Sequence, residues 1–339
     1  MNLTQKIKAA SELHQVLSDM HQPEWQATLR TAELENKWFS QEYIRAALEG
    51  IRLFLEEEQI RQWLSQYTNY SIPVKNPQKV GVIMAGNIPL VGFQDFWHVL
   101  MSGHILLAKM SSQDTVLLKK IAQILCDIEP EFQKQIHFVD LLKEADAYIA
   151  TGSNNSARYF EYYFAKKPHI IRKNRASLGI LKGDESESEL KTLSRDVFMY
   201  FGMGCRNISK LYLPEGYNLE ILQRAFQQWD CLVNHNKYGN NYDYNKSILL
   251  MNQEPFFDTG FLILQENARL VSPVAMMYYE FYKNQEDLYN KIQLHQDQTQ
   301  LLTSAQGWFP GSIPFGQSQK PKLWDYADGI DTFKFLLEL

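Results

Sequence analysis

The sequence predicts an α/β fold built on a parallel sheet with right-handed crossovers, preceded by a helical N-terminal segment. Three observations carry this prediction. From Val80 onward, short apolar runs alternate with amphipathic helical stretches, which is the pattern of consecutive βαβ units. Before about residue 75, apolar residues recur at helical spacing. With 339 residues the chain is more than twice the ~150 of a typical domain, so two domains or one large α/β domain are expected.

The elements follow the chain in order. The N-terminal segment is expected to be helical throughout, and residues 41–64 have apolar residues at helical spacing with charged residues on the other face. The first βα series predicts strands over residues 80–84, 104–110, 136–139, 147–151 and 169–172, and helices over 91–101, 115–128 and 155–165. The second series predicts helices over residues 187–201 and 219–234, and strands over 208–213, 247–251, 261–264, 274–279 and 300–303.

Charged residues divide the two series. The stretch 182–189 has no apolar side chain, so the main domain boundary is expected between residues 183 and 184. The resulting organisation is a helical segment over residues 1–75, a cofactor-binding domain over 76–183, a catalytic domain over 184–312 and a tail over 313–339 that completes the site and the interface.

Composition excludes several classes of protein. Lys and Arg number 34 against 39 Asp and Glu, a net charge of −5 without a long basic block, which argues against a nucleic-acid partner. Cys126, Cys205 and Cys231 form neither a disulfide framework nor a CxxC pair, so no structural metal is expected. The apolar stretch 80–108 is interrupted by polar residues and turns, and no secretory signal is visible. These features predict a cytoplasmic protein without a transmembrane segment.

Cys205 is the strongest candidate for chemistry. It follows Gly202 and Gly204, whose small size lets a ligand approach the backbone closely. Arg206 beside it would favour the thiolate, the form in which cysteine is a nucleophile. The alternative is that Cys205 is a small buried apolar residue. Cys126, on the apolar side of a predicted helix, and Cys231, after Trp229, fit that alternative.

Weaker candidates lie at the ends of predicted strands, where ligands bind in parallel sheets. The amide of Asn87 would stabilise an oxyanion, although it also suits an ordinary turn. Lys109, before Ser111 and Ser112, would hold a ribose or phosphate, or else be a surface lysine. The run Thr151, Gly152 and Ser153 opens a helix and suits phosphate binding. No G-x-G-x-x-G fingerprint accompanies these loops.

Taken in order, these motifs resemble the aldehyde dehydrogenase superfamily from about Val80 to the end. The matching segments are 86–90 (GNIPL, oxyanion motif), 103–112 (GHILLAKMSS, cofactor strand), 151–153 (TGS loop), 202–205 (GMGC, nucleophile), 272–274 (SPV) and 313–316 (IPFG). The resemblance implies an aldehyde dehydrogenase-like fold. It implies catalytic roles for Cys205 and Asn87, and cofactor binding by Lys109, Ser111, Ser112 and the residues of the TGS loop.

Within the superfamily, three further stretches resemble the short acyl-CoA reductases of the LuxC-like branch, which make fatty aldehydes. They are 206–210 (RNISK), 234–245 (NHNKYGNNYDYN) and 324–332 (WDYADGIDT). This resemblance implies reduction of an acyl-CoA thioester to an aldehyde through an acyl-enzyme on Cys205. It also implies a homodimer and, as a possible partner, an acyl-protein synthetase or acyltransferase.

At three positions this sequence differs from the aldehyde dehydrogenases that oxidise their substrates, and two of the differences bear on the expected reaction and cofactor. Arg172–Arg175 occupies the place of their general-base glutamate, and without that base the thioester would hydrolyse slowly, which suits a reductase. Ser112 replaces the glutamate that binds the adenine ribose, leaving room for the 2′-phosphate of NADPH. Arg269 stands where another cofactor glutamate would lie. Two alternatives remain: an acyl phosphate reductase, and a non-catalytic scaffold subunit of an acyl-transfer complex.

Overall fold

A computed structural model describes residues 1–20, 22–67, 74 and 76–339, and it divides into two compact units. The first unit contains Met1–Asn174 together with Pro321–Leu339, and the second contains Arg175–Lys320. This division lies earlier than the boundary expected at 183/184, because strand β6 (Ala176–Ile180) pairs with strands of the second sheet. The expected boundary at residue 75 lies outside the described residues.

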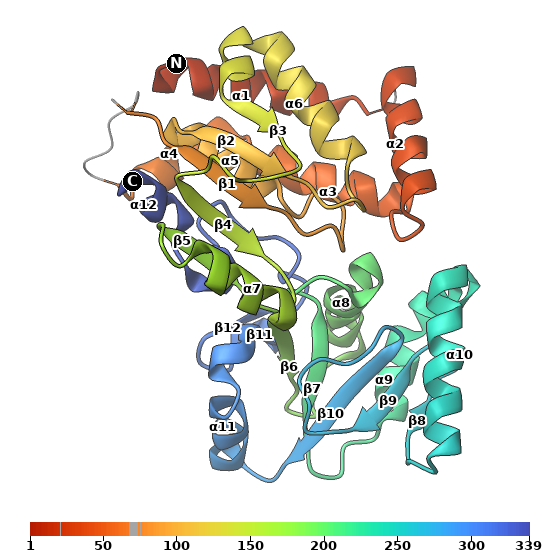
Figure 1. Cartoon of the computed structure of the whole chain (residues 1–339). Coiled ribbons are helices and arrows are strands. Elements are labelled where there is room, and N and C mark those ends of the chain that lie inside the picture. Colours follow the sequence, from red (N-terminus) through yellow and green to blue (C-terminus); the bar gives the residue numbers. More distant parts are fainter. Residues whose placement is uncertain (21, 68–73, 75) are drawn as a thin grey trace. The chain divides into compact units, whose positions relative to one another are not determined.

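The first unit is built on a five-stranded parallel sheet in the order β3-β2-β1-β4-β5 (Figure 1). Its strands are β1 (Lys79–Ile83), β2 (Ile105–Lys109), β3 (Ile136–Phe138), β4 (Ala147–Thr151) and β5 (His169–Arg172). The helices between them are α5 (Phe93–Ser102), α6 (Val116–Ile128) and α7 (Asn154–Phe164), with the 3-10 helix η1 (Pro130–Lys134). Every element that the sequence predicts in this series is present, which confirms the α/β fold class.

Helices α1 (Leu3–Ser18), α2 (Pro23–Glu35), α3 (Gln41–Phe54) and α4 (Glu57–Leu64) form the N-terminal segment. The helical N-terminal segment is confirmed, and the amphipathic stretch 41–64 is divided into two helices, α3 and α4. Buried positions Leu48, Ile51 and Leu55 follow helical spacing, but the next one, Ile60, comes five residues after Leu55. In one continuous helix Ile60 would turn away from the core, and the break returns it to the buried side.

The amine of Lys6 on α1 is buried at the end of α5. It donates hydrogen bonds to the carbonyls of Leu100 (2.7 Å) and Met101 (3.1 Å) in the last turn of that helix. Burial lowers the pKa of Lys6 to about 7. The neutral amine still carries the two N–H groups that these carbonyls need.

Replacing Lys6 with methionine is expected to change how stability depends on pH. Between about pH 7 and pH 10 the unfolded chain binds a proton on Lys6 that the folded chain does not, so stability from this group rises with pH. The rise is at most about 1.4 kcal/mol per pH unit, the limit for a difference of one bound proton. Urea unfolding at pH 7 and pH 9 should show a smaller rise in the Lys6→Met protein than in the native protein. Lys8→Met, on the exposed side of α1, should keep the native slope.

The C-terminal tail returns to the first unit and packs on its N-terminal helices. Trp63 Nε1 donates to the hydroxyl of Tyr326 at 2.7 Å, and the hydroxyls of Tyr326 and Tyr67 lie 2.5 Å apart. The same Tyr67 hydroxyl donates to the carboxylate of Asp331 at 3.0 Å. The stretch 324–332, which carries part of the family resemblance, therefore joins the tail to this unit.

A buried ion pair joins α5, the end of β5 and helix α12 (Thr332–Leu337). Arg172 donates to both carboxylate oxygens of Asp95, at 2.6 and 2.9 Å, and to the hydroxyl of Thr332 at 2.6 Å. Asp95 is 7% exposed and Arg172 5%, so water screens this pair very little.

The second unit is built on a seven-stranded sheet in the order β12-β11-β6-β7-β10-β9-β8 (Figure 1). All neighbouring strands are parallel except β8 and β9. Besides β6, they are β7 (Ile208–Pro214), β8 (Phe257–Asp258), β9 (Ile263–Glu266), β10 (Met276–Tyr282), β11 (Thr299–Ser304) and β12 (Ser312–Pro314). The helices are α8 (Glu187–Phe198), α9 (Glu220–Phe226), α10 (Asn236–Met251) and α11 (Gln285–Gln293).

Three expectations for this unit are wrong. The strand expected over 247–251 is the end of helix α10, whose apolar residues point in several directions and so lack the stripe of a surface helix. The helix expected over 187–201 ends at Phe198, where the 3-10 helix η2 (Met199–Gly202) begins. The helix expected over 219–234 is divided into α9 and the 3-10 helix η3 (Gln227–Asn234). Shorter 3-10 helices are η4 (Gln296–Gln298), η5 (Ala305–Gly307) and, in the first unit, η6 (Ala327–Gly329).

Candidate active site

Cys205 lies at an exposed turn between η2 and strand β7. The turn is closed by the side chain and backbone of one residue. Asn207 Oδ1 accepts from Gly204 N at 2.8 Å, while Asn207 N donates to Gly204 O at 2.9 Å. The hydroxyl of Ser177 on β6 donates to the carbonyl of Cys205 at 2.8 Å. The backbone around the thiol is therefore fixed from two directions, as a nucleophile on a rigid frame requires.

Asn207 also caps helix α8, a role that the sequence did not reveal. Its Nδ2 lies within 3.3 Å of three carbonyls at the end of that helix, those of Asp196, Val197 and Met199. The residue is 2% exposed, and one buried amide thus connects the end of the helix with the cysteine turn. The signal was present, because Asn207 lies in the 206–210 stretch that carries the resemblance, but a sequence motif does not show which groups its side chain bonds.

The backbone is strained in the residues that precede Cys205. Tyr200 and Phe201 have left-handed conformations, with φ of 52° and 57°, and Gly202 follows at 75°. Left-handed backbone is uncommon for residues other than glycine, and consecutive examples are held in place only by the surrounding structure. Burial raises the pKa of Tyr200 to about 12, so its hydroxyl stays protonated.

The segment 313–318 is held against the cysteine turn within the second unit. The carboxylate of Asp196 accepts from Gly316 N at 2.6 Å and from the hydroxyl of Ser318 at 2.6 Å. Arg206 Nε donates to the carbonyl of Ser318 at 2.5 Å. Burial raises the pKa of Asp196, against the opposing effect of these hydrogen bonds. Arg206 thus orders the segment that follows β12.

The other predicted site residues lie in the first unit, at one edge of its sheet. Asn87 follows β1, Ser111 and Ser112 follow β2, and Lys109 ends β2. Thr151 ends β4, and Gly152 and Ser153 lead into α7. Because β2, β1 and β4 are parallel neighbours, their carboxyl ends meet at the same edge, where parallel sheets bind ligands. The structure brings these seven residues to one edge, while Cys205 belongs to the second unit.

Close packing fixes two of these loops. A Cβ atom at Gly86 would come within 2.5 Å of Ser111 Oγ, so only glycine lets the loops after β1 and β2 approach so closely. Ser153 caps α7 by accepting from Ser156 N at 3.2 Å. The side chains of Asn87 and Ser112 are exposed at this edge, and Lys109 and Thr151 are half-buried.

Asp114 supports the Asn87 loop and is a second residue that sequence reasoning missed. Its Oδ2 accepts from Leu90 N at 2.6 Å, and Leu90 has a left-handed φ of 59°. Burial raises the pKa of Asp114 to about 6. An aspartate one turn before an amphipathic helix looks like an ordinary cap, so the sequence offered no signal for this contact.

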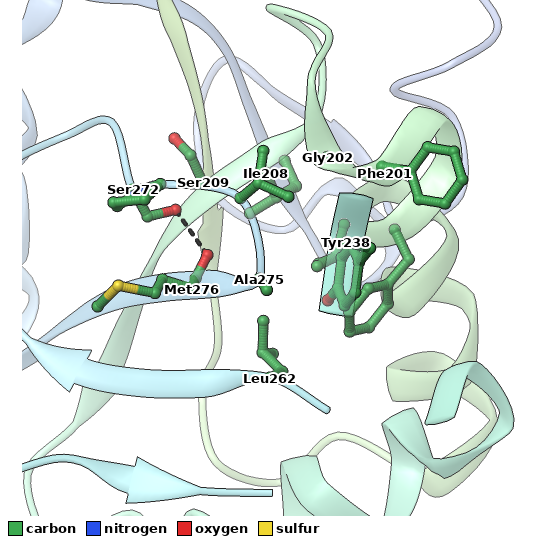
Figure 2. A pocket seen from close by; sticks show the side chains of 13 residues that line it. Phe201, Gly202, Ile208, Ser209, Tyr238, Leu262, Ser272, Ala275 and Met276 are labelled. Atoms are coloured by element: carbon green, nitrogen blue, oxygen red, sulfur yellow. Dashed lines mark hydrogen bonds between the residues drawn. The ribbon is translucent and has the colours of Figure 1, made fainter. Parts of the chain in front are cut away.

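A small pocket lies beside the cysteine turn, entirely within the second unit (Figure 2). It has a volume of about 20 Å³. Its walls come from the end of α8, η2, the start of β7, α10 and the loop before β10. The lining residues are Val197, Phe198, Phe201, Gly202, Ile208, Ser209, Tyr238, Leu262, Ser272, Pro273, Val274, Ala275 and Met276.

Helix α10, which carries the family-like stretch 234–245, forms part of this wall. Tyr238 lines the pocket, and the Nδ2 of Asn245 donates to the carbonyl of Val274 at 2.9 Å. Tyr242 donates to the carboxylate of Asp258 at 2.5 Å, which holds β8 against the helix. The stretch therefore positions the loop before β10.

Solved structures with the same fold include aldehyde dehydrogenases and an NADP-dependent enzyme. Aldehyde dehydrogenase 21 from Physcomitrella patens, in complex with succinate, matches all of this chain and 84% of its own at 12% identity and a TM-score of 0.69. A Mycobacterium tuberculosis aldehyde dehydrogenase complexed with NAD+ matches 90% of this chain and 73% of its own at 11% identity and a TM-score of 0.64. An E. coli NADP-dependent enzyme matches 90% and 73% at 13% identity and a TM-score of 0.62.

These low sequence identities show a shared fold alone. The family is shown by a comparison of sequences. No curated protein matches this sequence significantly. No helix among the described residues is long and apolar enough to cross a bilayer. The model of the acyl-CoA reductase (LuxC) family matches residues 7–223, which is more than half of the chain and includes Asn87, Lys109 and Cys205. The chain belongs to the acyl-CoA reductase (LuxC) family, and it is an aldehyde-forming acyl reductase with an aldehyde dehydrogenase-like fold.

Proposed function

We propose that the protein reduces an acyl-CoA thioester to an aldehyde with NADPH, through an acyl-enzyme on Cys205. One observation carries the proposal: among the three cysteines, Cys205 alone lies on a backbone turn that is fixed from two sides while remaining exposed. Cys126 is half-buried, and burial raises the pKa of its thiol. Cys231 is exposed but lies in η3, away from any such turn.

In the proposed first step, residues of this chain transfer the acyl group from CoA to Cys205. The Cys205 thiolate attacks the thioester carbonyl, a new C–S bond forms, and the C–S bond to CoA breaks as the CoA thiolate leaves. Exchange of one thioester for another is nearly isoenergetic and needs no strong base if the cysteine is partly ionised. We assign the oxyanion of this step to the backbone N–H of Cys205 and to the Asn87 amide, which matches the family motif. Losing one such donor typically costs about 100- to 1000-fold in rate.

The carboxyl edge of the first sheet fits a nicotinamide cofactor. Gly86 and Gly152 let the loops at this edge pack closely around their backbone N–H groups, since a Cβ atom at either position would lie within 3.0 Å of a neighbouring side chain. The cofactor supplies hydride when bound. Lys109, Ser111 and Ser112 are proposed to hold its adenine ribose, and the TGS loop its phosphates. No carboxylate faces the ribose from residues 109–112, which favours NADPH over NADH.

Replacing Ser112 with glutamate is expected to reverse the cofactor preference. A carboxylate at this exposed position would repel the 2′-phosphate of NADPH, at a cost of roughly 1–4 kcal/mol depending on local screening. Dissociation constants of NADPH and NADH, measured by fluorescence titration, should show tighter NADPH binding in the native protein and tighter NADH binding in the variant. Ser188→Glu, an equal change in charge on the second unit, should leave both constants unchanged. Equal affinity of the native protein for both cofactors would refute the assignment.

The decisive experiment mixes the native protein with NADPH and separately with acyl-CoAs and acyl phosphates, and follows the absorbance of the cofactor. Oxidation with acyl-CoA alone supports the proposal. Oxidation with acyl phosphate alone identifies an acyl phosphate reductase, and no oxidation with either supports the scaffold alternative.

We further propose that the protein acts as a homodimer in the cytoplasm, where its three thiols stay reduced. An acyl-protein synthetase or acyltransferase is the proposed partner that delivers acyl groups. Light scattering after size exclusion tests the oligomeric state, with and without such a partner.

A further inference from the structure

The loop that carries Asn87 is held by a residue of the neighbouring loop. Asn87 lies between β1 and α5, and the backbone of this loop turns at Leu90, which has a left-handed φ of 59°. Leucine is strained in this conformation, so the surrounding structure has to hold it there. Leu90 N donates a hydrogen bond to Asp114 Oδ2 at 2.6 Å. This contact fixes the backbone three residues after Asn87.

The carboxylate that makes this contact is itself buried. Asp114 is 8% exposed, and among the described residues its other oxygen, Oδ1, has no hydrogen-bond partner. One backbone N–H replaces only part of the hydration that such a carboxylate loses, so the residue is costly for the stability of the fold. Residues that are kept at such a cost are expected at functional sites.

The loop between β2 and α6, which carries Asp114, is anchored on the end of α2. Asn36 Nδ2 donates to the carbonyl of Gln113 at 3.2 Å, and the Thr115 hydroxyl donates to Glu35 Oε2 at 2.9 Å. Asp114 lies between these two anchored residues, so contacts other than its own carboxylate determine where it sits. A hydrogen bond from a loop to such a fixed acceptor restricts the loop.

We propose that Asp114 is a positioning residue, which acts through Leu90 to hold the Asn87 amide where it stabilises the oxyanion of acyl transfer. The inference rests on the proposed function, because it takes Asn87 as an oxyanion donor. A small shift of the loop is enough for a large effect, since a displacement of about 1 Å at a reacting centre can cost about 100-fold in rate.

Hydrogen exchange tests the contact without any substrate. Exchange of the Leu90 amide is followed by mass spectrometry of a peptide that contains the loop. In the Asp114→Ala protein, which lacks the acceptor, this amide should exchange about 10- to 100-fold faster, the factor that corresponds to a hydrogen bond to a charged group. Asp114→Asn keeps an acceptor oxygen of the same reach, and it should restore most of the protection.

Acylation of Cys205 tests the positioning role. Each protein is given acetyl-, butyryl- or octanoyl-CoA without NADPH, and the gain of the acyl group is timed by mass spectrometry. Asp114→Ala should slow this reaction by about 10- to 100-fold, because the Asn87 amide is misplaced rather than removed. Asp114→Asn should recover most of the rate. Alkylation of Cys205 by iodoacetamide passes through no oxyanion, so its rate should be the same in all three proteins.

Asp146→Ala is the matched control. Asp146 Oδ2 accepts from Lys79 N at 3.0 Å, a contact of the same kind at the opposite end of β1. This variant should leave the exchange of the Leu90 amide and both rates at Cys205 unchanged.

Asn36→Ala tests the proposal without altering Asp114. It removes the hydrogen bond to Gln113 and so loosens the loop on which Asp114 is carried. The exchange of the Leu90 amide should rise and acylation should slow, each by less than in the Asp114→Ala protein.

Three results would overturn the proposal: unchanged exchange of the Leu90 amide in Asp114→Ala, unchanged acylation in that variant, or an equal loss of acylation and alkylation. Failure of the proposed function would be seen in the native protein instead, as no acylation of Cys205 by any of the three acyl-CoAs. In that case the exchange measurement still shows whether Asp114 holds the loop.

Discussion

The Cys205→Ser protein is expected to lose acyl-CoA reduction by at least about 1000-fold while binding NADPH as the native protein does. A serine hydroxyl is a much weaker nucleophile than a thiol at neutral pH, because a small fraction of a thiol is ionised there and almost none of a hydroxyl is. The hydrogen bonds that shape the turn use the backbone of Cys205 and the side chain of Asn207, so the substitution leaves them in place. Turnover is followed by cofactor absorbance, and NADPH binding by fluorescence titration.

The other cysteines provide the controls. Cys126→Ser and Cys231→Ser should retain activity. Native protein given acyl-CoA without NADPH should gain the mass of one acyl group, mapped by peptide analysis to Cys205. An acyl adduct on another residue, or full activity in the Cys205→Ser protein, would remove the basis of the mechanism.

Breaking the buried ion pair of the first unit is expected to produce the largest loss of stability. In the Asp95→Ala protein, the Arg172 guanidinium stays buried without its carboxylate partner, and changes of this kind typically cost about 3–5 kcal/mol. Urea unfolding measures the difference in the free energy of unfolding. The loss should be seen when a probe in the first unit, such as Trp63, reports the transition.

Two further variants show whether the loss comes from the unpaired charge. The double variant Asp95→Leu with Arg172→Met removes both charges, and it should recover most of the stability lost in Asp95→Ala. Glu144→Ala breaks the pair with Lys79 on the surface, where water screens both partners, and should leave stability nearly unchanged. A small loss in Asp95→Ala would contradict the structural role of the pair.

Most of the first sheet could be predicted from the sequence, because each strand is a short apolar run bounded by turn residues. Strand β6 was missed for a physical reason. Its five residues (ASLGI) include glycine and serine and follow the charged run Lys173–Arg175, so nothing local distinguishes them from a loop. The strand is stabilised by pairing on both sides with β7 and β11, which only tertiary structure provides. The boundary between the units was misplaced for the same reason.

The opposite error occurred at residues 247–251. The run SILLM has the length and composition of a buried strand, and a short apolar run does not distinguish a strand from the end of a helix. Helix α10 continues through it from Asn236 because hydrogen bonds of Tyr242 and Asn245 anchor the helix earlier along its length.

In the candidate site, the sequence identified the proposed reacting residues better than the residues whose hydrogen bonds hold them in place. Cys205 stood out because glycines and an arginine surround it, and Asn87 because it follows a strand. The contacts made by Asn207 and Asp114 depend on residues that folding brings close together, and residue type alone does not predict them. The left-handed backbone at Tyr200 and Phe201 was equally hidden, since neither residue type favours it.

The return of the tail to the first unit has a consequence for the order in which the protein folds as it is synthesised. The second unit, residues 175–320, lies between two segments of the first, so all of it leaves the ribosome before the tail does. Trp63 packs on Phe333, with ring centres 4.3 Å apart, and this contact requires a residue that is made after the whole second unit. Although domains generally complete in order from the N-terminus, the first unit here is completed only after the second unit has been made. Until residues 321–339 are made, the aromatic side chains of the first unit lack these packing partners and stay exposed to solvent. A nascent chain has most need of a chaperone during that interval.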